Sequence, residues 1–304
     1  MDFTLYWFMF PVSMLVATTA MLSGIGGAAL FTPIFVIIFP LLGPEYPLSS
    51  TVAAIGTALL TETFGFSSGF IGYFRKGLID YGTAWRFIRI AVPVAIVGAL
   101  VAHLVADHFL ILGYAALMLI LSLVMVFLHH QLAEPVEAAV PNPAGSTVGA
   151  ARADAEMREI HARDGVVHRY RRPRIGPIGA MVTSVGAFLT GMLSVGIGEV
   201  VMPQLTKRGV PVGVAAATSV MAVIVTVALA SFTQISKLIA EGGLSAVPWN
   251  LVCYTIPAVI IGGQIGPRLQ GKVDQHTMER AIGALFLVIA VAMAYIGVMR
   301  LFAS

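Results

Sequence analysis

The sequence predicts an all-α protein that crosses a membrane several times and is built from two related halves. Of its 304 residues, 58% are hydrophobic and only 11% are charged, whereas an ordinary soluble domain has about 25% charged residues. Between His129 and Pro177, 7 arginines and 6 acids form a polar connector that separates two hydrophobic halves. These observations exclude a disordered chain, a small disulfide-stabilised secreted domain and a typical soluble enzyme.

The hydrophobic runs match the length of membrane-spanning helices, which need about 20 apolar residues. We expect full spans at residues 3–23, 48–74, 87–106, 109–128, 175–193, 212–236, 247–265 and 281–302. Two shorter apolar segments, 28–42 and 199–205, each follow a glycine-rich break. The chain therefore divides into a first transmembrane repeat (1–128), a polar linker (129–174) and a second transmembrane repeat (175–304).

The two halves repeat one pattern. When Pro33 is placed on Pro203, Gly26 falls on Gly196. Further matches follow in the same order: Thr57 with Thr218, Trp85 with Trp249, Pro93 with Pro257, Gly98 with Gly262 and Asp107 with Asp274. Ordered matches at a nearly constant offset indicate an internal duplication.

The basic residues predict how the repeats lie in the membrane. If both short segments cross, each repeat has five segments and 16 of the 18 Lys and Arg residues fall on one side, which the positive-inside rule identifies as cytoplasmic. If the short segments only dip in and return, 13 fall inside and 5 outside. The first arrangement agrees better with the rule, and an odd number of segments inverts the second repeat relative to the first, as in many transporters. The length of segment 199–205 disagrees with a full crossing, because seven residues span only about 10 Å as a helix, less than the thickness of a bilayer.

The glycine breaks are candidate anion-binding sites. A helix interrupted inside a membrane leaves backbone N–H groups unpaired, and these groups together with the helix dipole attract anions. Two interrupted segments at matching places in two halves are the best sequence indication of a transport site. The alternative is that the glycines only let helices pack closely. The candidate residues at the breaks are Ser23, Gly24, Gly26, Gly27, Ser194, Gly196 and Gly198.

Three hydroxyl residues extend this candidate site. Thr57 occupies a position that the duplication matches with Thr218, and Ser219 follows directly. Hydroxyl groups there can coordinate an oxyanion, or they can bond back to their own helix. We include Thr57, Thr218 and Ser219 as candidate substrate-binding residues.

Two acids lie within the hydrophobic halves. Glu62 falls in the middle of segment 48–74 on a stripe of small residues, so it faces the bundle rather than lipid. An ionisable group in a membrane is costly and is a functional candidate; it can carry a proton, or it can bond across helices as a neutral carboxyl. Glu199 directly follows the second break, where it can couple protons or merely cap a helix.

Other patterns in the chain favour less specific roles. Residues 65–69 match G-x-S-x-G around Ser67, but that motif marks a nucleophile only on a strand–turn–helix, so a serine enzyme is the weakest alternative. Cys253 is the single cysteine, which excludes internal disulfides and cysteine-based metal clusters. We expect no cofactor and no metal site.

The linker and the net charge point to the membrane. Residues 149–163 are rich in helix formers, which predicts a short surface helix, and the basic run 168–174 can contact anionic lipid headgroups. The net charge of +3 comes from basic residues that flank apolar runs. This placement indicates membrane topology rather than binding of nucleic acid.

The first break resembles a known family signature. Residues 24–35, GIGGAALFTPIF, are similar to the G-x-G-G-G-x-L-x-x-P-x-L motif of the sulfite exporter TauE/SafE family, also called the toluene-sulfonate uptake permeases. In the first break, Ala28 stands where the motif has its third glycine. The second break resembles the motif more loosely, because Ser194 and Ile197 stand where glycines are usual. The resemblance implies a multi-pass protein of the cytoplasmic membrane that moves a small sulfur-containing anion, such as sulfite, thiosulfate, sulfoacetate or another organosulfonate.

We therefore expect a secondary transporter that works by alternating access. The two breaks would cradle the anion, and Glu62 and Glu199 would couple its movement to protons. No G-x-x-x-x-G-K-[ST] motif of an ATPase occurs. A passive anion channel, in which Glu62 only selects or gates, is the main alternative.

The topology gives the first testable prediction. Both termini should face the outside, with residues 75–89, 129–177 and 266–280 inside, because this arrangement places most basic residues in the cytoplasm. A cysteine introduced at Ser304 in a Cys253→Ser background should react with a membrane-impermeant maleimide on intact cells. Reaction only after permeabilisation would reject the five-plus-five arrangement.

Overall fold

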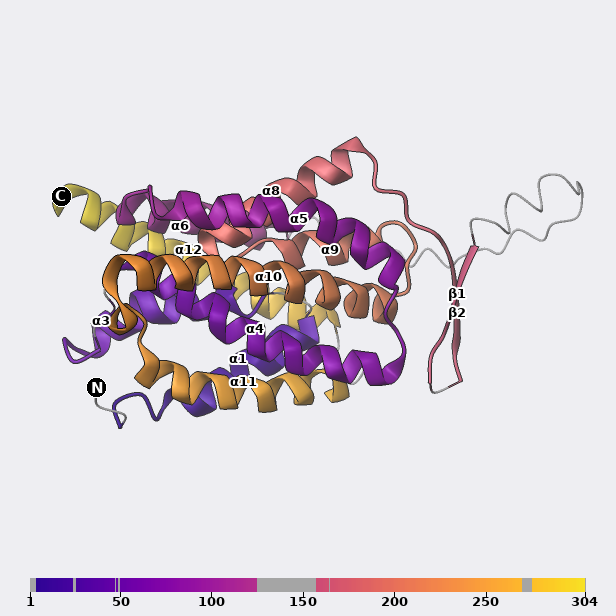
Figure 1. The fold of residues 1–304 in the computed structure, drawn as a ribbon, viewed down its shortest axis with the longest axis horizontal. Coiled ribbons are helices and arrows are strands. Elements are labelled where there is room, and N and C mark those ends of the chain that lie inside the picture. Colours follow the sequence, from indigo (N-terminus) through magenta and orange to yellow (C-terminus); the bar gives the residue numbers. More distant parts are fainter. Residues whose placement is uncertain are drawn as a thin grey trace, which may run out of the picture.

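The structure is an elongated bundle of helices with a two-stranded sheet at one end. It is a computed structural model that describes residues 4–23, 26–46, 48, 50–124, 157–163, 165–269 and 275–303. Both termini lie at one end of the bundle, which we call the termini end (Figure 1). The described part of the linker, from residue 157 onward, lies at the opposite end, which we call the linker end.

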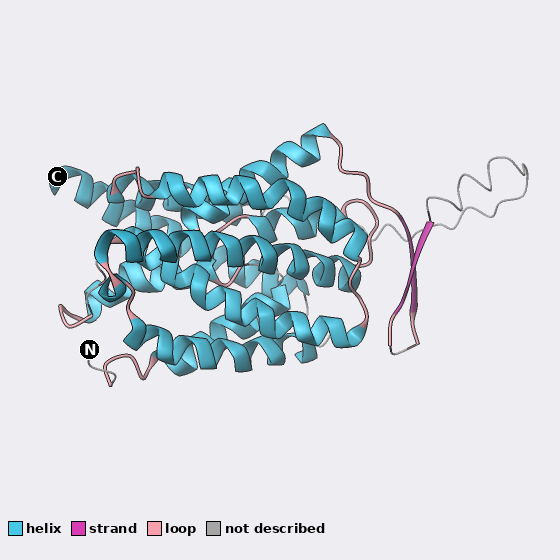
Figure 2. Cartoon of the chain, in the orientation of Figure 1, coloured by secondary structure: helices cyan, strands magenta, loops and turns pink. Residues whose placement is uncertain are grey.

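Helices account for nearly all of the described chain, as Figure 2 shows. The first half contains α1 (Met9–Ser23), α2 (Ala28–Pro33), the π-helical turn η1 (Ile34–Ile38), α3 (Phe39–Leu42), α4 (Thr51–Lys76), α5 (Tyr81–Ala102) and α6 (Asp107–Leu123). The second half contains α8 (Pro177–Leu193), α9 (Ile197–Thr206), α10 (Val212–Gly242), the 3₁₀ turn η4 (Leu244–Ala246), α11 (Trp249–Leu269) and α12 (Gln275–Ala303). The prediction of an all-α protein with several apolar helices is confirmed.

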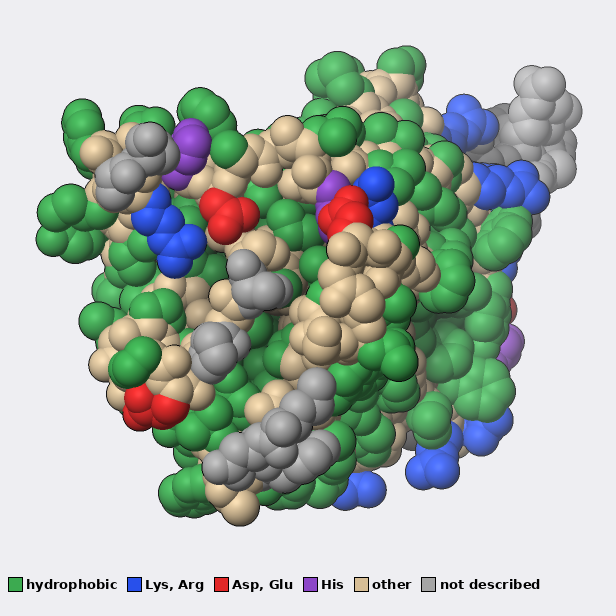
Figure 3. Space-filling view, turned by 60° about the vertical axis from the view of Figure 1, so that its left-hand side comes forward, with side chains coloured by type: hydrophobic (Ala, Val, Ile, Leu, Met, Phe, Trp, Pro, Cys, Tyr) green, Lys and Arg blue, Asp and Glu red, His purple; other side chains and the backbone are tan. Residues whose placement is uncertain are grey.

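The outer surface suits a lipid environment. In the part of the chain that the structure describes, four helices are long and apolar enough to cross a membrane: Tyr81–Ala102, Val212–Gly242, Trp249–Leu269 and Arg280–Phe302. Hydrophobic side chains cover much of the face in Figure 3, and Lys and Arg side chains gather along its right-hand edge, toward the linker end. Many large apolar side chains, such as Phe232 and Val288, are exposed, which is expected where the neighbour is hydrocarbon.

The two short segments begin inside the bundle and run to opposite ends. Segment α9 lies antiparallel to α8, because Gln204 Nε2 donates to Thr183 Oγ1 at 3.1 Å and a Cβ on Gly186 would lie 2.8 Å from Val200. At the other end, the ring of Phe39 in α3 lies 5.3 Å from that of Tyr6, just before α1. Ten residues of α9 extend about 15 Å, so this helix reaches from the middle of the bundle to the linker end only.

The two halves interlock rather than form separate domains. Helix α1 packs on α11 and, in matching fashion, α5 packs on α8. Both contacts are close: a Cβ on Gly262 would clash with Met14 O, and one on Gly98 would clash with Phe188 O. Helices α4 with α10 and α6 with α12 complete the bundle. Small residues let these backbones approach, as in other membrane helix pairs.

The linker contains a β-hairpin where we predicted a helix. Strand β1 (Met157–His161) pairs antiparallel with β2 (Val167–Arg171), with Arg158 opposite Tyr170. The predicted surface helix is therefore wrong for residues 157–161, while residues 149–156 lie outside the described residues. Tertiary contacts of Arg158 and Tyr170 override the local helix propensity.

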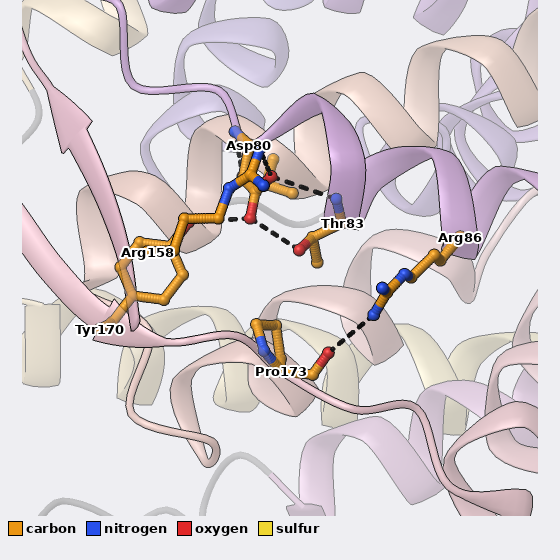
Figure 4. A network of polar contacts seen from close by, with 7 residues as sticks. Asp80, Thr83, Arg86, Arg158, Tyr170 and Pro173 are labelled. Carbon is orange, nitrogen blue, oxygen red and sulfur yellow. Dashed lines mark hydrogen bonds and ion pairs between the residues drawn. The ribbon is translucent and has the colours of Figure 1, made fainter. Parts of the chain in front are cut away.

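The hairpin docks on Asp80 at the linker end (Figure 4). Asp80 is 2% exposed; Arg158 Nη2 lies 3.0 Å from its carboxylate, and Tyr170 OH donates to it at 2.9 Å. The same carboxylate caps α5 by accepting from Thr83 N–H. Burial by itself would raise the pKa of Asp80, but hydrogen bonds from Thr83 and Tyr170 and the Arg158 guanidinium hold this pKa below its usual range.

This network predicts how the hairpin is held. Asp80→Asn keeps a helix-capping side chain but loses the charge that faces Arg158, so trypsin should cleave residues 157–171 faster. A carboxylate with a lowered pKa stabilises only while ionised, so wild-type docking should persist at neutral pH and weaken as the pH falls below about 4. Asp107→Asn, at the termini end, is the matched control. Equal cleavage of all three proteins would show that Asp80 does not hold the hairpin.

Candidate functional site

The two glycine breaks meet in the interior of the bundle. Gly26 N–H donates to Glu199 Oε1 at 3.0 Å, so the first break contacts the residue that follows the second. Thr32 Oγ1 and Ser194 Oγ lie 2.8 Å apart and share a hydrogen bond between α2 and the end of α8. Segments that are far apart in the sequence therefore form one polar cluster between the halves.

Glu199 joins the backbone of both breaks. Its Oε1 accepts from Gly26 N–H and its Oε2 accepts from Gly196 N–H at 3.1 Å. Glu199 lies in the first turn of α9, where backbone N–H groups have no partner within the helix and the dipole favours a negative charge. One carboxylate thus occupies the donors that we expected to hold an anion.

Glu62 approaches the same place from α4. It is 3% exposed, and the N–H groups of Gly27 and Ala28 face its carboxylate. Its Oε1 is shielded from solvent and has no hydrogen-bond partner among the described residues. A Cβ on Gly26 would lie 2.9 Å from Glu62 Oε1 and 3.4 Å from Glu199 Oε1. Both acids therefore lie against one glycine, although the sequence places them in different segments.

Buried hydroxyl groups that the sequence analysis missed bind the backbone of the two short segments, α2 and α9. Tyr114 OH, on α6, donates to Ala29 O at 2.9 Å. Thr190 Oγ1 accepts from Ile197 N–H at 2.7 Å and so satisfies the first turn of α9. Tyr114 could have been identified from the sequence, because it is a polar residue in the middle of the apolar α6. Thr32 and Thr190 could not, because threonines often bond within their own helix.

The predicted residues at the breaks fall into two groups. Gly26, Gly27, Ser194, Gly196 and Gly198 are buried at or beside the meeting point. Gly24 lies outside the described residues, as does the side chain of Ser23.

The hydrogen bonds of the three predicted hydroxyls involve other groups. Thr57 Oγ1 donates to Ala53 O of its own helix at 2.7 Å. Thr218 Oγ1 accepts from Asp80 N–H at 3.0 Å, which ties it to the linker end. Ser219 is buried, and its hydroxyl has no partner among the described residues. None of these contacts joins the three residues to the breaks.

The G-x-S-x-G pattern lies inside a helix. Ser67 is part of α4, and its hydroxyl donates to Thr63 O, one turn earlier, at 2.6 Å. The strand–turn–helix that exposes a serine nucleophile is not formed at this position. The motif therefore offers no support for a serine enzyme.

The glycines give a prediction that separates packing from binding. Gly196 has φ +139°, and a Cβ there would lie 2.7 Å from Gly186 O, so Gly196→Ala should destabilise the fold as Gly98→Ala and Gly262→Ala do, by about 1–3 kcal/mol each. Gly26→Ala should lose less stability, because its methyl group would meet side-chain carboxylates, but it should alter anion affinity. Melting temperature and anion affinity, measured on each variant, test this.

Gly113→Ala is the control, since its Cβ would meet only Leu193 Cδ1 at 3.8 Å. Unchanged affinity in Gly26→Ala, with a stability loss equal to that of Gly196→Ala, would leave the breaks with a packing role only.

Comparison with known proteins agrees with this architecture. The family described as "Sulfite exporter TauE/SafE" matches residues 9–293. The chain is 22% identical over 289 residues to the probable membrane transporter protein YunE of Bacillus subtilis (strain 168), which covers 94% of this chain and 96% of that protein. No solved structure matches. Since the family match spans nearly the whole chain, this protein belongs to the sulfite exporter TauE/SafE family of membrane transporters.

Proposed function

We propose that the protein is a proton-coupled secondary transporter that carries a small sulfur-containing anion across the cytoplasmic membrane. The family indicates transport. The observation that carries the finer proposal is the Glu199 carboxylate, which accepts one N–H from each glycine break. Sulfite, thiosulfate, sulfoacetate and other organosulfonates are the candidate substrates.

In this proposal, Glu199 and the substrate compete for the same donors. Backbone N–H groups at helix N-termini bind anions well because their dipoles point at the ligand. While Glu199 is ionised, its carboxylate holds Gly26 N–H and Gly196 N–H. Protonation removes its charge and weakens both bonds, so an arriving anion can take the donors. Binding of the anion and the proton then leaves the net charge of the site unchanged.

Glu62 supplies the second proton-binding group. Two carboxylates beside one buried glycine cannot both be ionised without a large cost, because little water screens their repulsion. The unpartnered Oε1 of Glu62 is the atom best placed to hold a proton next to Glu199. A proton shared between the acids would let the site change charge when the substrate enters or leaves.

Alternating access requires two halves that can rearrange around the site. Two observations support an inverted repeat. Helices of one half pack on helices of the other, α1 on α11 and α5 on α8, and the short segments run from the interior to opposite ends. Each half would then expose the central donors to one side of the membrane. The positive-inside rule favours a cytoplasmic linker end.

Uptake into proteoliposomes tests the proposal. Labelled sulfite should accumulate when an inward proton gradient is imposed, and Glu62→Gln should abolish this dependence while sulfite still protects the protein against thermal unfolding. Glu199→Gln should also lose the dependence, because an amide cannot take up a proton. Glu241→Gln, an exposed acid at the termini end, is the control.

Two outcomes would contradict the proposal. Flux that follows the anion gradient alone, in wild type and variants alike, would indicate a passive pore. An unchanged pH profile in Glu62→Gln would make Glu62 structural and leave Glu199 as the remaining proton carrier.

A further inference from the structure

A second polar feature lies between α8 and α9 at the linker end, away from the two acids. Along α8, Gly179, Thr183, Gly186 and Thr190 are buried and follow one another at helical spacing, so they share one face. Contacts of Gly179, Thr183 and Gly186 show that this face is turned toward α9. Arg208, in the turn after α9, and Gln204, on α9, lie over its outer part.

The guanidinium of Arg208 lies directly against α8. A Cβ on Gly179 would be 2.5 Å from Arg208 Nη2 and 3.6 Å from Cζ, so the absence of a side chain at residue 179 makes room for the charge. Arg208 Nη1 is shielded from solvent and has no hydrogen-bond partner among the described residues. A buried charged donor without a partner costs more than a neutral one, so it needs an explanation.

Gln204 leaves an acceptor unused beside this donor. Its Nε2 donates to Thr183 Oγ1 at 3.1 Å, which fixes the orientation of the amide. Its Oε1 is buried, has no partner in the part of the chain that the structure describes, and would lie 3.0 Å from a Cβ on Gly179. A guanidinium and a neutral acceptor therefore lie at the same glycine, and one atom of each, Arg208 Nη1 and Gln204 Oε1, has no hydrogen-bond partner among the described residues.

We propose that Arg208 and Gln204 form a binding subsite for a small oxyanion at the linker end. Guanidinium groups bind oxyanions such as sulfonate, sulfite or phosphate through short charge-assisted bonds. Gln204 Oε1 would accept from a second group of the ligand, such as the ammonium group of taurine. The role of this subsite in transport rests on the proposed function, whereas the binding of an oxyanion there does not.

The position of the subsite gives it a role in capture. Thr183 and Thr190 continue the same face of α8 from Arg208 toward Ile197 N–H and the first turn of α9, where Glu199 lies. An anion bound at Arg208 would therefore lie about three helical turns from the central donors, the distance from Gly179 to Thr190 along α8. A positive charge at the linker end raises the local anion concentration and the rate of association.

Neutralising one of two adjacent charges tests the subsite. In full-length protein reconstituted in phosphatidylcholine, Arg208→Gln should raise the KM for sulfite presented at the linker end by about tenfold, the effect of one charge-assisted bond, with little change in kcat. Lys207→Gln removes the same charge from the neighbouring, exposed side chain and should change KM by less than about twofold.

Gln204→Leu provides an independent variant that keeps the guanidinium. It should reduce the preference for taurine over ethanesulfonate, which has no ammonium group, in thermal-shift binding assays. If Arg208→Gln does not fold, this comparison still tests the subsite. Equal effects of Arg208→Gln and Lys207→Gln, or an unchanged taurine preference in Gln204→Leu, would overturn it.

Lipid and free anion can be distinguished in the same assays. If the ligand is a lipid phosphate, adding phosphatidylglycerol should stabilise wild type and Lys207→Gln but not Arg208→Gln, and sulfite should have no such selective effect. If the protein transports nothing but sulfite protects wild type and not Arg208→Gln, the subsite stands and the transport proposal fails.

Discussion

The carboxylate of Glu199 is the interaction on which the centre of this protein depends. Two interrupted helices leave backbone N–H groups in an interior where no lipid or bulk water can satisfy them. Glu199 takes one such group from each break, Gly26 N–H and Gly196 N–H. A single side chain therefore both joins the two breaks and occupies the donors that we propose for the anion. Any ligand that uses these donors has to displace it.

Close backbone packing holds the frame around this centre. Gly98 and Gly262 bring α5 onto α8 and α11 onto α1 at distances that exclude a methyl group. These contacts join one half to the other. The hairpin fixed to Asp80 adds a contact at the linker end, where the backbone of Asp80 also bonds Thr218 of α10. Packing and polar contacts thus favour concerted over independent motion.

Periodicity and composition predicted the apolar helices, the duplication and the break positions, because these depend on local sequence and on the requirement that membrane segments satisfy their own backbone. Glu62 and Glu199 were also found from sequence, since acids are rare among apolar residues. The β-hairpin was missed: residues 149–163 favour a helix locally, and only the distant Asp80 gives Arg158 and Tyr170 their partner.

The sequence by itself determined the helical class and the positions of the glycine breaks, and it predicted the two-part plan, for these follow from hydropathy and spacing along the chain. The tertiary structure decided which groups meet. It set Glu62 and Glu199 against one glycine, paired Thr57 with Ala53 and Thr218 with Asp80, and left Arg208 and Gln204 each with a hydrogen-bonding atom that no described residue satisfies. These features depend on contacts between residues far apart in the chain. Such contacts are set by how the helices cross and how closely they pack, and local propensity does not determine them.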